Sequence, residues 1–481
     1  MTAVAAAPGG ARRVALNTVA PMAARLFDAA FALVYLRILG RAEVGEYAFL
    51  VVFTTYLDTL VDFGLNALVA REVSRGSVSA SAAFRAVNLL RLALWLAGLP
   101  LVALVYGPLR SLTNLPDDAV PAGWVFYLAL LPSILAKTAS GLLWAAERLE
   151  LTAGVQVMST LLRTALGAVA LFAGLALVGL ATASLLTNVV TALVLWRLSA
   201  RAMTVHEPAE GATARVGPRV WLGQSWPLFV NQLLQGLFFK IDSLLLLPLA
   251  GAAPAGIYAA AYKVSEGAGI ISSSFTLALF PRLSRESDLS HAYRLALRIL
   301  LQLAFPLAAG IALLSEPIVG LVGGREYLPD SAIALAILIC YLPLSYANGL
   351  TQYVLIAAGQ QHLLTRAFVA ALVFNLTANV LLIPRFGYVG AAWVTVFSEV
   401  VLLVPFQWVA RRVAPGVSLV NEARIPIVAT LLMAPVVWWL RDAIHPLAAI
   451  GAGALVYPLA LWALGGLDER QVRLLRHLVA R

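Results

Sequence analysis

The feature that most constrains this chain is a succession of long apolar runs, separated by short polar joints, from one end to the other. A helix needs roughly 20 apolar residues to cross the hydrocarbon core of a bilayer. Backbone N–H and C=O groups meet no water there, so helices, which satisfy these groups internally, are the expected spanning elements. The sequence therefore predicts an all-α integral membrane protein.

Composition and charge placement point to lipid as the surrounding solvent. Charged residues make up 12% of the chain and hydrophobic residues 61%, whereas a soluble protein is about 25% charged. The net charge of +10 would suit nucleic acid only if the basic residues formed a water-facing surface, and most lie instead in short joints between apolar runs. We therefore expect membrane lipids as partners and no nucleic acid.

Cofactor chemistry is not indicated by the sequence. Cys340 is the single cysteine, and the five histidines are scattered over joints and helix ends. This spacing predicts neither a disulfide, nor a zinc site, nor a catalytic triad. The stretch MTAVAAAPGGARR has no apolar core before its Arg pair, so we expect no cleaved signal peptide.

The apolar runs divide into fourteen expected transmembrane helices. They cover residues 14–37, 45–69, 86–108, 123–146, 153–175, 179–198, 222–248, 256–281, 293–315, 330–358, 365–384, 389–410, 425–440 and 447–465. With a cytoplasmic N-terminus, twenty-two arginines fall on inner segments and six on outer segments. Because short cytoplasmic loops are enriched in Lys and Arg, this asymmetry predicts both termini inside and an even number of spans.

One short pattern occurs twice, at the start of the second and of the eighth expected helix. GRAEVGEYA at 40–48 returns as GAAPAGIYA at 251–259, and VGLATASLLTNVV at 178–190 returns at the same offset as VGAAWVTVFSEVV at 389–401. Two matches at one offset predict two six-helix lobes in parallel repeat, related by a pseudo-twofold axis along the membrane normal.

The residues of the repeated pattern suggest a tight outer turn. Gly40 and Gly251 are expected to end one helix, and Gly45 and Gly256 to let the next helix pack closely. The tyrosine that follows, Tyr258 in the second copy, is expected in the aromatic belt at the membrane interface.

The predicted organisation has four parts. They are an N-lobe of helices 1 to 6 (1–199), a cytoplasmic linker (200–221), a C-lobe of helices 7 to 12 (222–410), and helices 13 and 14 with a cytoplasmic amphipathic tail (411–481). In the tail, Val472, Leu475 and Val479 share one helical face, so we expect it to lie on the inner leaflet.

Three stretches resemble the multidrug/oligosaccharidyl-lipid/polysaccharide exporter superfamily, and within it the polysaccharide-type flippases. They are LGRAEVGEYAFLVVFTTYLDTLVDFGLNALVAREVSRG at 39–76, FFKIDSLLLLPLAGAAPAGIYAAAYKVSEGAGIISSSFTLALFPRLSRE at 238–286, and RAFVAALVFNLTANVLLIPRFGYVGAAWVTVFSEVV at 366–401. The resemblance extends over nearly the whole chain, including the helix number and the extra helix pair.

This resemblance implies an alternating-access flippase for cell-surface polysaccharide assembly, such as that of O-antigen. Its substrate would be a lipid-linked oligosaccharide on a polyprenyl pyrophosphate carrier, moved from the inner to the outer leaflet of a prokaryotic plasma membrane. A glycan polymerase or ligase is the associated partner that it implies, and we expect the chain itself to be a monomer. In related lipid II flippases helices 13 and 14 shape a groove for the lipid tail, a placement that residues 425–465 match.

Three other functions are compatible with an apolar, basic chain to different degrees. A cation-coupled multidrug exporter and a lipid II flippase of the same superfamily stay open as alternatives. A membrane glycosyltransferase or glycan polymerase usually needs a sizeable extramembrane segment with acids or histidines. The longest outer joints, 109–122 and 316–329, carry four acids and no histidine, so we do not expect an enzyme.

Ionisable side chains near the middle of a span are costly in lipid, so they are expected to face a cavity or a partner. The cations are Arg25, Lys137, Arg163, Lys240 and Lys263, and the acids, which are candidate coupling or gating groups, are Asp28, Asp58, Asp242, Glu266 and Glu399. Arg91 lies one turn from a helix end and is expected to snorkel. Asp62, at the end of the second expected helix, is expected to pair with a nearby base or backbone group.

A pyrophosphate head group requires cations, and Arg suits it through bidentate hydrogen bonding. The resemblance favours Arg25 and Lys240, because the first helices of the lobes line the cavity in the family; Arg163, Lys137 and Lys263 follow. The equal number of acids leaves an ion-pairing role open for each cation. Arg25 with Asp28, and Lys263 with Glu266, are three residues apart and are expected to neutralise each other locally.

Similar lipid II flippases bind sodium through an acid on helix 7, an Asn and an Asp on helix 11, and groups on helix 12. The residues in comparable places here are Asp242, Asn375, Asn379, the Ala391 carbonyl and Thr395. Asn375 and Asn379 share one helical face, but Asn379 stands where that pattern has Asp. The interpretations left open are a weakened Na⁺ site, proton coupling through Asp242, and amides that merely bond helix to helix.

Overall fold

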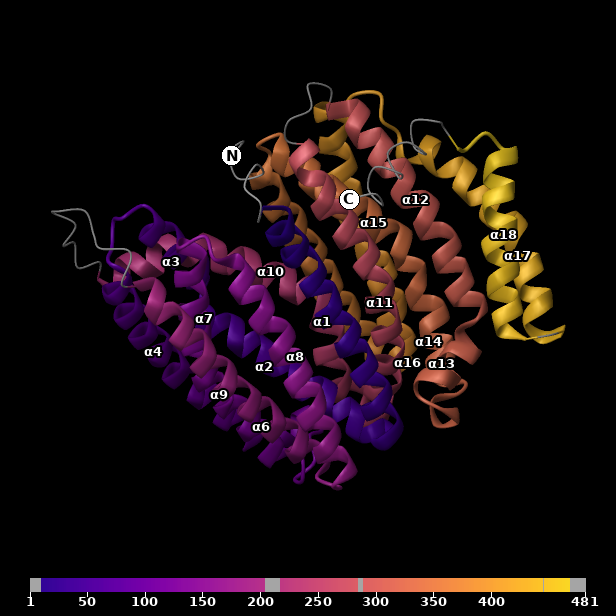
Figure 1. Ribbon diagram of the computed structural model, residues 1–481. Helices are drawn as coiled ribbons and strands as arrows, with labels where there is room; N and C mark the ends of the chain where they lie inside the picture. The colour runs from indigo at the N-terminus through magenta and orange to yellow at the C-terminus, as the bar shows by residue number, and fades with distance from the viewer. Residues whose placement is uncertain (1–9, 204–216, 284–288, 444, 468–481) are drawn as a thin grey trace. The chain divides into compact units, whose positions relative to one another are not determined.

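A computed structural model describes residues 10–203, 217–283, 289–443 and 445–467, and within these ranges the chain is helical, with no strand (Figure 1). The helices up to the break at 203 are α1 Gly10–Ile38, α2 Arg41–Asp62, α3 Leu65–Ser74, α4 Ala80–Tyr106, α5 Arg110–Thr113, α6 Val120–Leu128, α7 Leu130–Ala145, α8 Leu149–Phe172 and α9 Ala176–Met203. Those beyond it are α10 Pro218–Ala250, α11 Ala252–Leu283, α12 Leu289–Leu313, α13 Ser315–Val322, η2 Arg325–Tyr327, α14 Asp330–Leu338, η3 Ile339–Tyr341, α15 Leu342–Ala357, α16 Gln361–Val413, α17 Leu419–Ala443 and α18 Pro446–Ala463. The predicted all-α architecture is confirmed for this part of the chain.

Eleven stretches in the described ranges are long and apolar enough to cross a membrane. One of them is most of α16, which contains two of the helices expected from the sequence and is broken between them at Gly387, where φ is 54° and ψ is −134°. Glycine is the residue that adopts a positive φ without steric cost. The full count of fourteen spans stays a prediction.

The chain divides into two compact units, Met1–Gly256 and Ile257–Arg481. In the first unit α10 packs on α2 and α3, where Phe229 stacks on Phe63 with ring centroids 4.3 Å apart. A methyl group on Gly64 would lie only 2.8 Å from Cβ of Leu228, so the approach depends on that glycine. The seventh expected helix is thus built into the first compact unit. The predicted lobe boundaries stay predictions, because packing alone does not report which helices move together.

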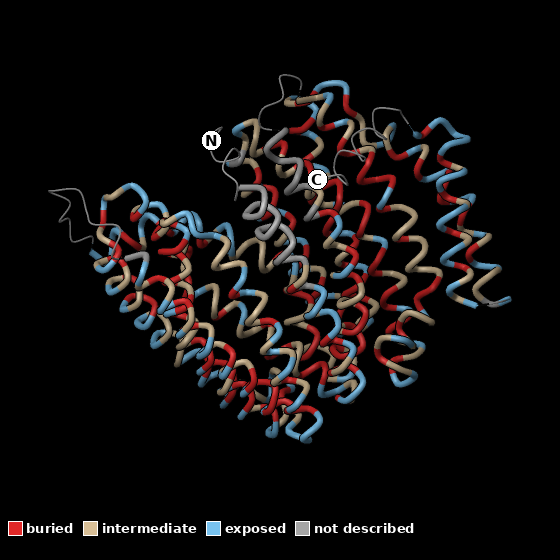
Figure 2. Tube along the Cα trace, viewed as in Figure 1, coloured by how far each residue is buried: buried red, intermediate tan, exposed pale blue. Residues whose placement is uncertain are grey.

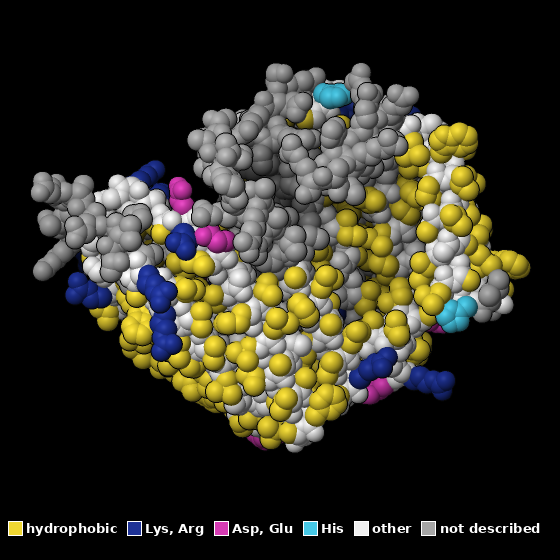
Figure 3. Space-filling view, viewed as in Figure 1, with side chains coloured by type: hydrophobic (Ala, Val, Ile, Leu, Met, Phe, Trp, Pro, Cys, Tyr) yellow, Lys and Arg dark blue, Asp and Glu magenta, His cyan; other side chains and the backbone are white. Residues whose placement is uncertain are grey.

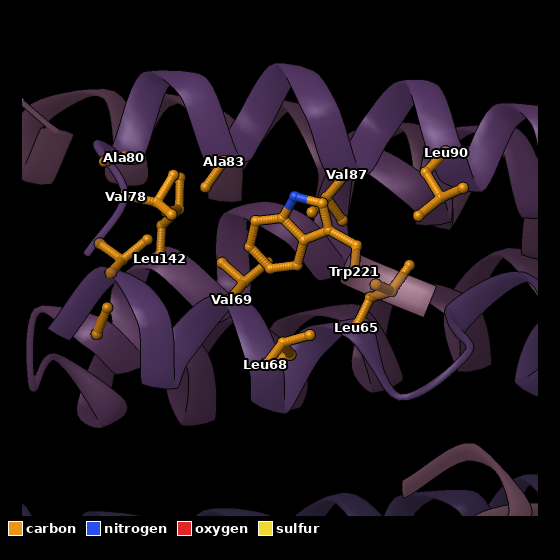
Figure 4. Close-up of a cluster of buried hydrophobic side chains, with 12 residues drawn as sticks. Leu65, Leu68, Val69, Val78, Ala80, Ala83, Val87, Leu90, Leu142 and Trp221 are labelled. Atoms are coloured by element: carbon orange, nitrogen blue, oxygen red, sulfur yellow. The ribbon is translucent and has the colours of Figure 1, made fainter. Parts of the chain in front are cut away.

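A buried cluster between α3 and α4 forms part of the first unit's core. Figure 4 shows Trp221, from the start of α10, inserted among Leu65 and Val69 of α3 and Val87 of α4. Apolar side chains at three- and four-residue spacing on α3 and α4 supply the facing stripes. Trp221 therefore fixes the beginning of α10 against two helices that are distant from it in sequence.

The two copies of the repeated glycine pattern meet within the first unit. A Cβ on Gly45 would lie 2.0 Å from the Ala252 carbonyl oxygen, and one on Gly256 would lie 1.7 Å from the carbonyl oxygen of Arg41. The starts of α2 and α11 thus touch backbone to backbone, which only residues without a side chain permit. The expectation that Gly45 and Gly256 allow close packing is confirmed, whereas Tyr258 is fully buried and does not face lipid.

In the second unit α17 and α18 lie side by side and pack on α12 (Figure 1). Met433, Val437 and Tyr457 form a buried cluster between them. Polar bonds add to this contact: the Tyr457 hydroxyl donates to the carbonyl of Gln302 at 2.7 Å, and the Arg441 guanidinium donates to the carbonyl of Leu313 at 2.7 Å. The two last helices are therefore tied to α12 by apolar and polar contacts.

Large apolar side chains are exposed along the helices. In Figure 2 exposed segments alternate with buried ones along individual helices, as one-sided packing requires. Figure 3 shows hydrophobic side chains covering much of the visible surface, and the exposed set includes Phe172, Trp439, Leu447 and Trp462. Such continuous apolar surface suits lipid contact. The predicted linker falls mostly in 204–216 and the predicted tail mostly in 468–481, both outside the described residues.

Candidate functional site

In the first unit α1 and α8, which pack together along their lengths, join two of the predicted intramembrane charges. The Arg163 guanidinium on α8 donates to a carboxylate oxygen of Asp28 on α1 at 3.0 Å. Both side chains are partly exposed, at 45% and 39%. Asp28 thus has a partner on another helix, in addition to the local one expected; the side chain of Arg25 lies outside the described residues.

A second cross-helix pair joins α7 to α2. The Lys137 ammonium lies 2.7 Å from Oδ2 of Asp58, and the Ser133 hydroxyl lies 3.4 Å from Oδ1. About a third of each charged side chain is exposed, 29% for Lys137 and 32% for Asp58. Both charged groups of this pair are therefore partly accessible.

The third pair lies deeper, between α4 and α2. Arg91 is fully buried, and its guanidinium donates to Asp62 at 2.6 Å and to the Thr138 hydroxyl at 2.6 Å. The expectation that Arg91 snorkels is wrong, because its helix packs against α7 and α2 on the side where Arg91 lies. Asp62 does pair with a base, as expected, and Thr138 continues the network to Asn88 at 2.6 Å.

These three pairs form a set that we call the first-unit ion pairs: Asp28–Arg163, Asp58–Lys137 and Asp62–Arg91. Asp58 and Asp62 are four residues apart and therefore share one face of α2. Lys137 and Thr138 are neighbours on α7, and Thr138 accepts a hydrogen bond from Arg91, so α2 and α7 each contribute a residue to both the accessible pair and the surroundings of the buried pair. A carboxylate–cation pair of this kind can release its cation to a phosphate group, which forms equally strong charge-assisted hydrogen bonds.

In the second unit Lys263 and Glu266 pair within α11. Their charged atoms lie 3.2 Å apart, so the predicted local neutralisation is confirmed. The candidate head-group ligand Lys240 belongs to α10 of the first unit and is half-buried. Asp242, two residues on, is buried and accepts a hydrogen bond from the backbone N–H of Ser243 at 2.7 Å.

The predicted sodium ligands of the second unit lie on the two halves of α16. Asn375 and Asn379 share one face, as predicted, and the amide of Asn379 donates to Oδ1 of Asn375 at 2.6 Å. Beyond the break at Gly387, the Thr395 hydroxyl donates to the Ala391 carbonyl at 3.1 Å and lies 3.1 Å from the Tyr258 hydroxyl. Asp242 belongs to the first unit, and the other four predicted ligands belong to the second.

Oxygen atoms on α16 fit a cation only in part. Asn375, Asn379, Thr395 and the Ala391 carbonyl supply neutral oxygens, and Oδ1 of Asn379 is buried without a hydrogen-bond partner. An unpartnered buried oxygen is the kind of group that a cation or a water molecule would satisfy. Among the described residues, no group of three or more His, Cys, Asp or Glu side chains is arranged to hold a metal ion.

Glu399 is the fifth predicted acid and is buried on the second half of α16. The Asn348 amide on α15 donates to its Oε2 at 2.7 Å and to its backbone carbonyl at 2.9 Å. Sequence reasoning identified Glu399 and missed Asn348, as it missed Asn88 and Thr138. The sequence feature that could have identified these three residues is a lone amide or hydroxyl side chain within an otherwise apolar span.

Comparison with known proteins identifies the family to which the chain belongs. Residues 11–287, more than half of the chain, match the family described as polysaccharide biosynthesis protein. The chain belongs to that family. Residues 228–457 also match the family described as Lipid II flippase MurJ. The predicted superfamily is thereby confirmed, and the apolar helices of a chain in this family make it a multi-pass membrane protein.

Two relatives illustrate the match. The probable low-salt glycan biosynthesis flippase Agl15 of Haloferax volcanii is 31% identical over 149 residues, which is 30% of this chain and 31% of the relative. The putative O-antigen transporter of Shigella dysenteriae is 22% identical over 187 residues, 38% of this chain and 47% of the relative. The chain therefore spans less than half the length of these relatives.

Solved structures show the same fold. The inward closed conformation of the lipid II flippase MurJ has a TM-score of 0.74 at 14% identity and covers 92% of this chain and 97% of that chain. The inward-facing conformation of a multidrug resistance MATE family transporter of the MOP superfamily has a TM-score of 0.64 at 16% identity, covering 81% and 94%. At such low identity the similarity establishes the fold alone.

Proposed function

We propose that this protein is an alternating-access flippase that moves a lipid-linked oligosaccharide across the plasma membrane for cell-surface polysaccharide assembly. The family match over residues 11–287 carries the proposal, and both relatives have names that refer to glycan or O-antigen transport. The substrate class is a polyprenyl-pyrophosphate saccharide that enters from the inner leaflet and leaves in the outer one.

Partly exposed cations within the spans supply the chemistry for an anionic head group. Lys137 and Arg163 are accessible and each is held by a carboxylate in the first unit. A pyrophosphate replaces the carboxylate as the partner of each cation, so the pairs bind the head group and re-form when it leaves. Arg25, Lys240 and Lys263 are proposed as further head-group ligands, with Asp28, Asp58, Asp242, Glu266 and Glu399 as coupling or gating acids.

The coupling ion, the topology and the assembly belong to the same proposal. Sodium would be held by Asp242, Asn375, Asn379, the Ala391 carbonyl and Thr395, whereas a proton would be carried by one of the acids.

In the proposed topology both termini face the cytoplasm, and fourteen helices form two pseudosymmetric lobes with an added pair. The chain acts as a monomer beside a glycan polymerase or ligase. The positive-inside asymmetry of its arginines supports this topology.

Translocation in proteoliposomes tests the proposal. A radiolabelled polyprenyl-pyrophosphate saccharide becomes accessible to an externally added glycosidase only after it crosses the bilayer. We expect Lys137→Gln and Arg163→Gln each to reduce the initial rate about ten-fold or more, as the loss of one charge-assisted contact of roughly 1.5–3 kcal/mol implies. The matched control Arg148→Gln removes the same charge from an exposed joint, where Arg148 pairs with Glu150, and should leave the rate unchanged.

The alternative in the same superfamily has a distinct signature. A multidrug exporter would extrude organic cations such as ethidium from the same proteoliposomes and would leave the saccharide in its original leaflet. Wild-type extrusion of ethidium without saccharide translocation would refute the flippase. Equal loss of activity in Arg148→Gln would refute the head-group role of the intramembrane cations.

A further inference from the structure

One acid of the second unit stands apart from the others in its surroundings. Glu399, on α16, is 3% exposed, and Asn348, on α15, is also 3% exposed. Both contacts between them come from the same amide nitrogen, which donates to Oε2 at 2.7 Å and to the Glu399 carbonyl at 2.9 Å.

No cation neutralises Glu399 among the residues that the structure describes. On α16 itself the other charged or titratable side chains described are His362, Arg366, Arg385, Tyr388, Arg411 and Arg412. On the elements that pack against α16 or form hydrogen bonds with it they are Tyr258, Tyr262, Lys263 and Glu266 of α11, His291, Tyr293, Arg294 and Arg298 of α12, Asp330 of α14, Cys340 and Tyr341 of η3, and Tyr346 and Tyr353 of α15. The lysine and the two arginines of α11 and α12 form ion pairs with other acids. Lys263 pairs with Glu266, and Arg294 and Arg298 pair with Glu422.

Burial without a cation favours the neutral, protonated form of a carboxyl group. An ionised carboxylate in such a position would cost several kcal/mol, and a group in this situation usually takes up a proton instead. The remaining polar atom of the cluster agrees with this: Oδ1 of Asn348 is buried and has no hydrogen-bond partner. That oxygen is a buried acceptor on the residue that bonds to Glu399, and a hydrogen-bond donor such as a water molecule would satisfy it.

The orientation of the amide argues against a metal cation at this place. Asn348 presents its N–H to the carboxyl, not its oxygen. A sodium ion between the two groups would require oxygens on both sides, since an N–H donor repels it. The residues predicted as sodium ligands on α16 include neither Glu399 nor Asn348, and Thr395 among them lies four residues before Glu399.

We propose that Glu399 and Asn348 form a proton-binding site in the second unit, and that Glu399 gains and loses its proton during each transport cycle. The second part rests on the proposed flippase function. The amide N–H that donates to Oε2 stabilises the ionised form when the site is wetted, and the apolar surroundings restore the proton when the site closes. A single carboxyl group thereby links proton movement to a conformational change.

Infrared difference spectroscopy of the purified protein in nanodiscs tests the site without any transport substrate. Between acid and alkaline buffer the wild type should lose a protonated-carboxyl stretching band that Glu399→Gln lacks at both pH values. The matched control Glu266→Gln removes an acid that is already ionised beside Lys263 and should keep the band. A Glu399-dependent band that persists at every pH at which the protein stays folded would overturn the proposal, and so would the absence of such a band.

A variant at the partner residue keeps the test valid if Glu399→Gln does not fold. Asn348→Leu removes the amide that bonds to Oε2, so it should shift the frequency of the same band. An unchanged frequency would show that the band arises from another group.

The transport part has its own readout. A gradient of one pH unit can supply about 1.4 kcal/mol per proton, or up to about ten-fold stimulation. Glu399→Gln should translocate the saccharide at a rate that the gradient no longer changes. Stimulation equal to that of the wild type would refute the coupling role. Failure of the wild type to translocate the saccharide would refute the flippase and leave the infrared result to decide the proton site.

Discussion

Three acids of the first unit and two acids of the second unit differ in the groups that lie against their carboxyl groups. Asp28, Asp58 and Asp62 in the first unit each lie against a cation carried by another helix. In the second unit Glu266 has its cation on the same helix, and Glu399 has an amide. Cross-helix pairs tie charge neutralisation to the packing of the helices, whereas a local pair or an amide leaves the acid independent of the neighbouring cations.

This difference separates two tasks that a transporter has to perform. The accessible cations of the first unit suit a large anion, because they become available when their carboxylates are displaced. A buried acid without a cation suits a proton, because its charge state changes with its surroundings. The comparison predicts that the same change from a carboxyl to an amide costs much more stability in the first unit than in the second.

The largest effect is expected at the buried pair of the first unit. Asp62→Asn leaves the guanidinium of Arg91, which is 0% exposed, without its carboxylate. Removing one partner of a buried pair costs about 3–5 kcal/mol. The same carboxyl-to-amide change in Glu399→Gln should cost about 1 kcal/mol or less, because it replaces one neutral group by another. Unfolding by sodium dodecyl sulfate in mixed micelles, followed by tryptophan fluorescence, measures both.

The double variant Asp62→Asn with Arg91→Met provides the control. Removing both charges leaves none uncompensated, so most of the lost stability should return. Equal losses for Asp62→Asn and Glu399→Gln would break the comparison between the units.

An intermediate effect is expected at the accessible pair of Lys137 and Asp58. Because both side chains are about a third exposed, solvent screens their attraction, and the interaction should contribute below about 1 kcal/mol to stability. A double-mutant cycle with Lys137→Gln and Asp58→Asn measures this term in the same unfolding assay. A coupling as large as that of the buried pair would mean that Lys137 is too strongly held to exchange its partner for an anionic head group.

Much of the helical architecture was predictable, because the sequence features that encode it are either local or repeated along the chain. The length of the apolar runs predicts the helices. The repeated pattern predicts close packing at Gly45 and Gly256, and the contact between these two glycines explains why the pattern occurs twice. The pair of Lys263 and Glu266 was predictable for the same reason, since a spacing of three residues fixes their proximity on any helix.

The cross-helix pairs were not predictable from spacing. Asp28 and Arg163 are 135 residues apart, and they meet only because α1 packs on α8. The expected exposure of Arg91 is wrong because proximity to a helix end does not decide exposure: its side chain points toward Asp62 and Thr138. Rotation of a helix about its axis decides such contacts, and an apolar run with similar residues on all sides does not reveal it.

The smallest effect is expected at Lys263 and Glu266, and it sharpens the comparison from the second unit. A local pair three residues apart contributes about 0.2–0.5 kcal/mol to the stability of a helix. Lys263→Gln should therefore shift the unfolding midpoint only slightly, and the exchanged pair Lys263→Glu with Glu266→Lys should restore it, since the spacing is kept. A loss above about 1 kcal/mol that the exchange does not restore would show that Lys263 also acts across helices. The second unit would then hold its charges as the first unit does, and the isolation of Glu399 would no longer distinguish it.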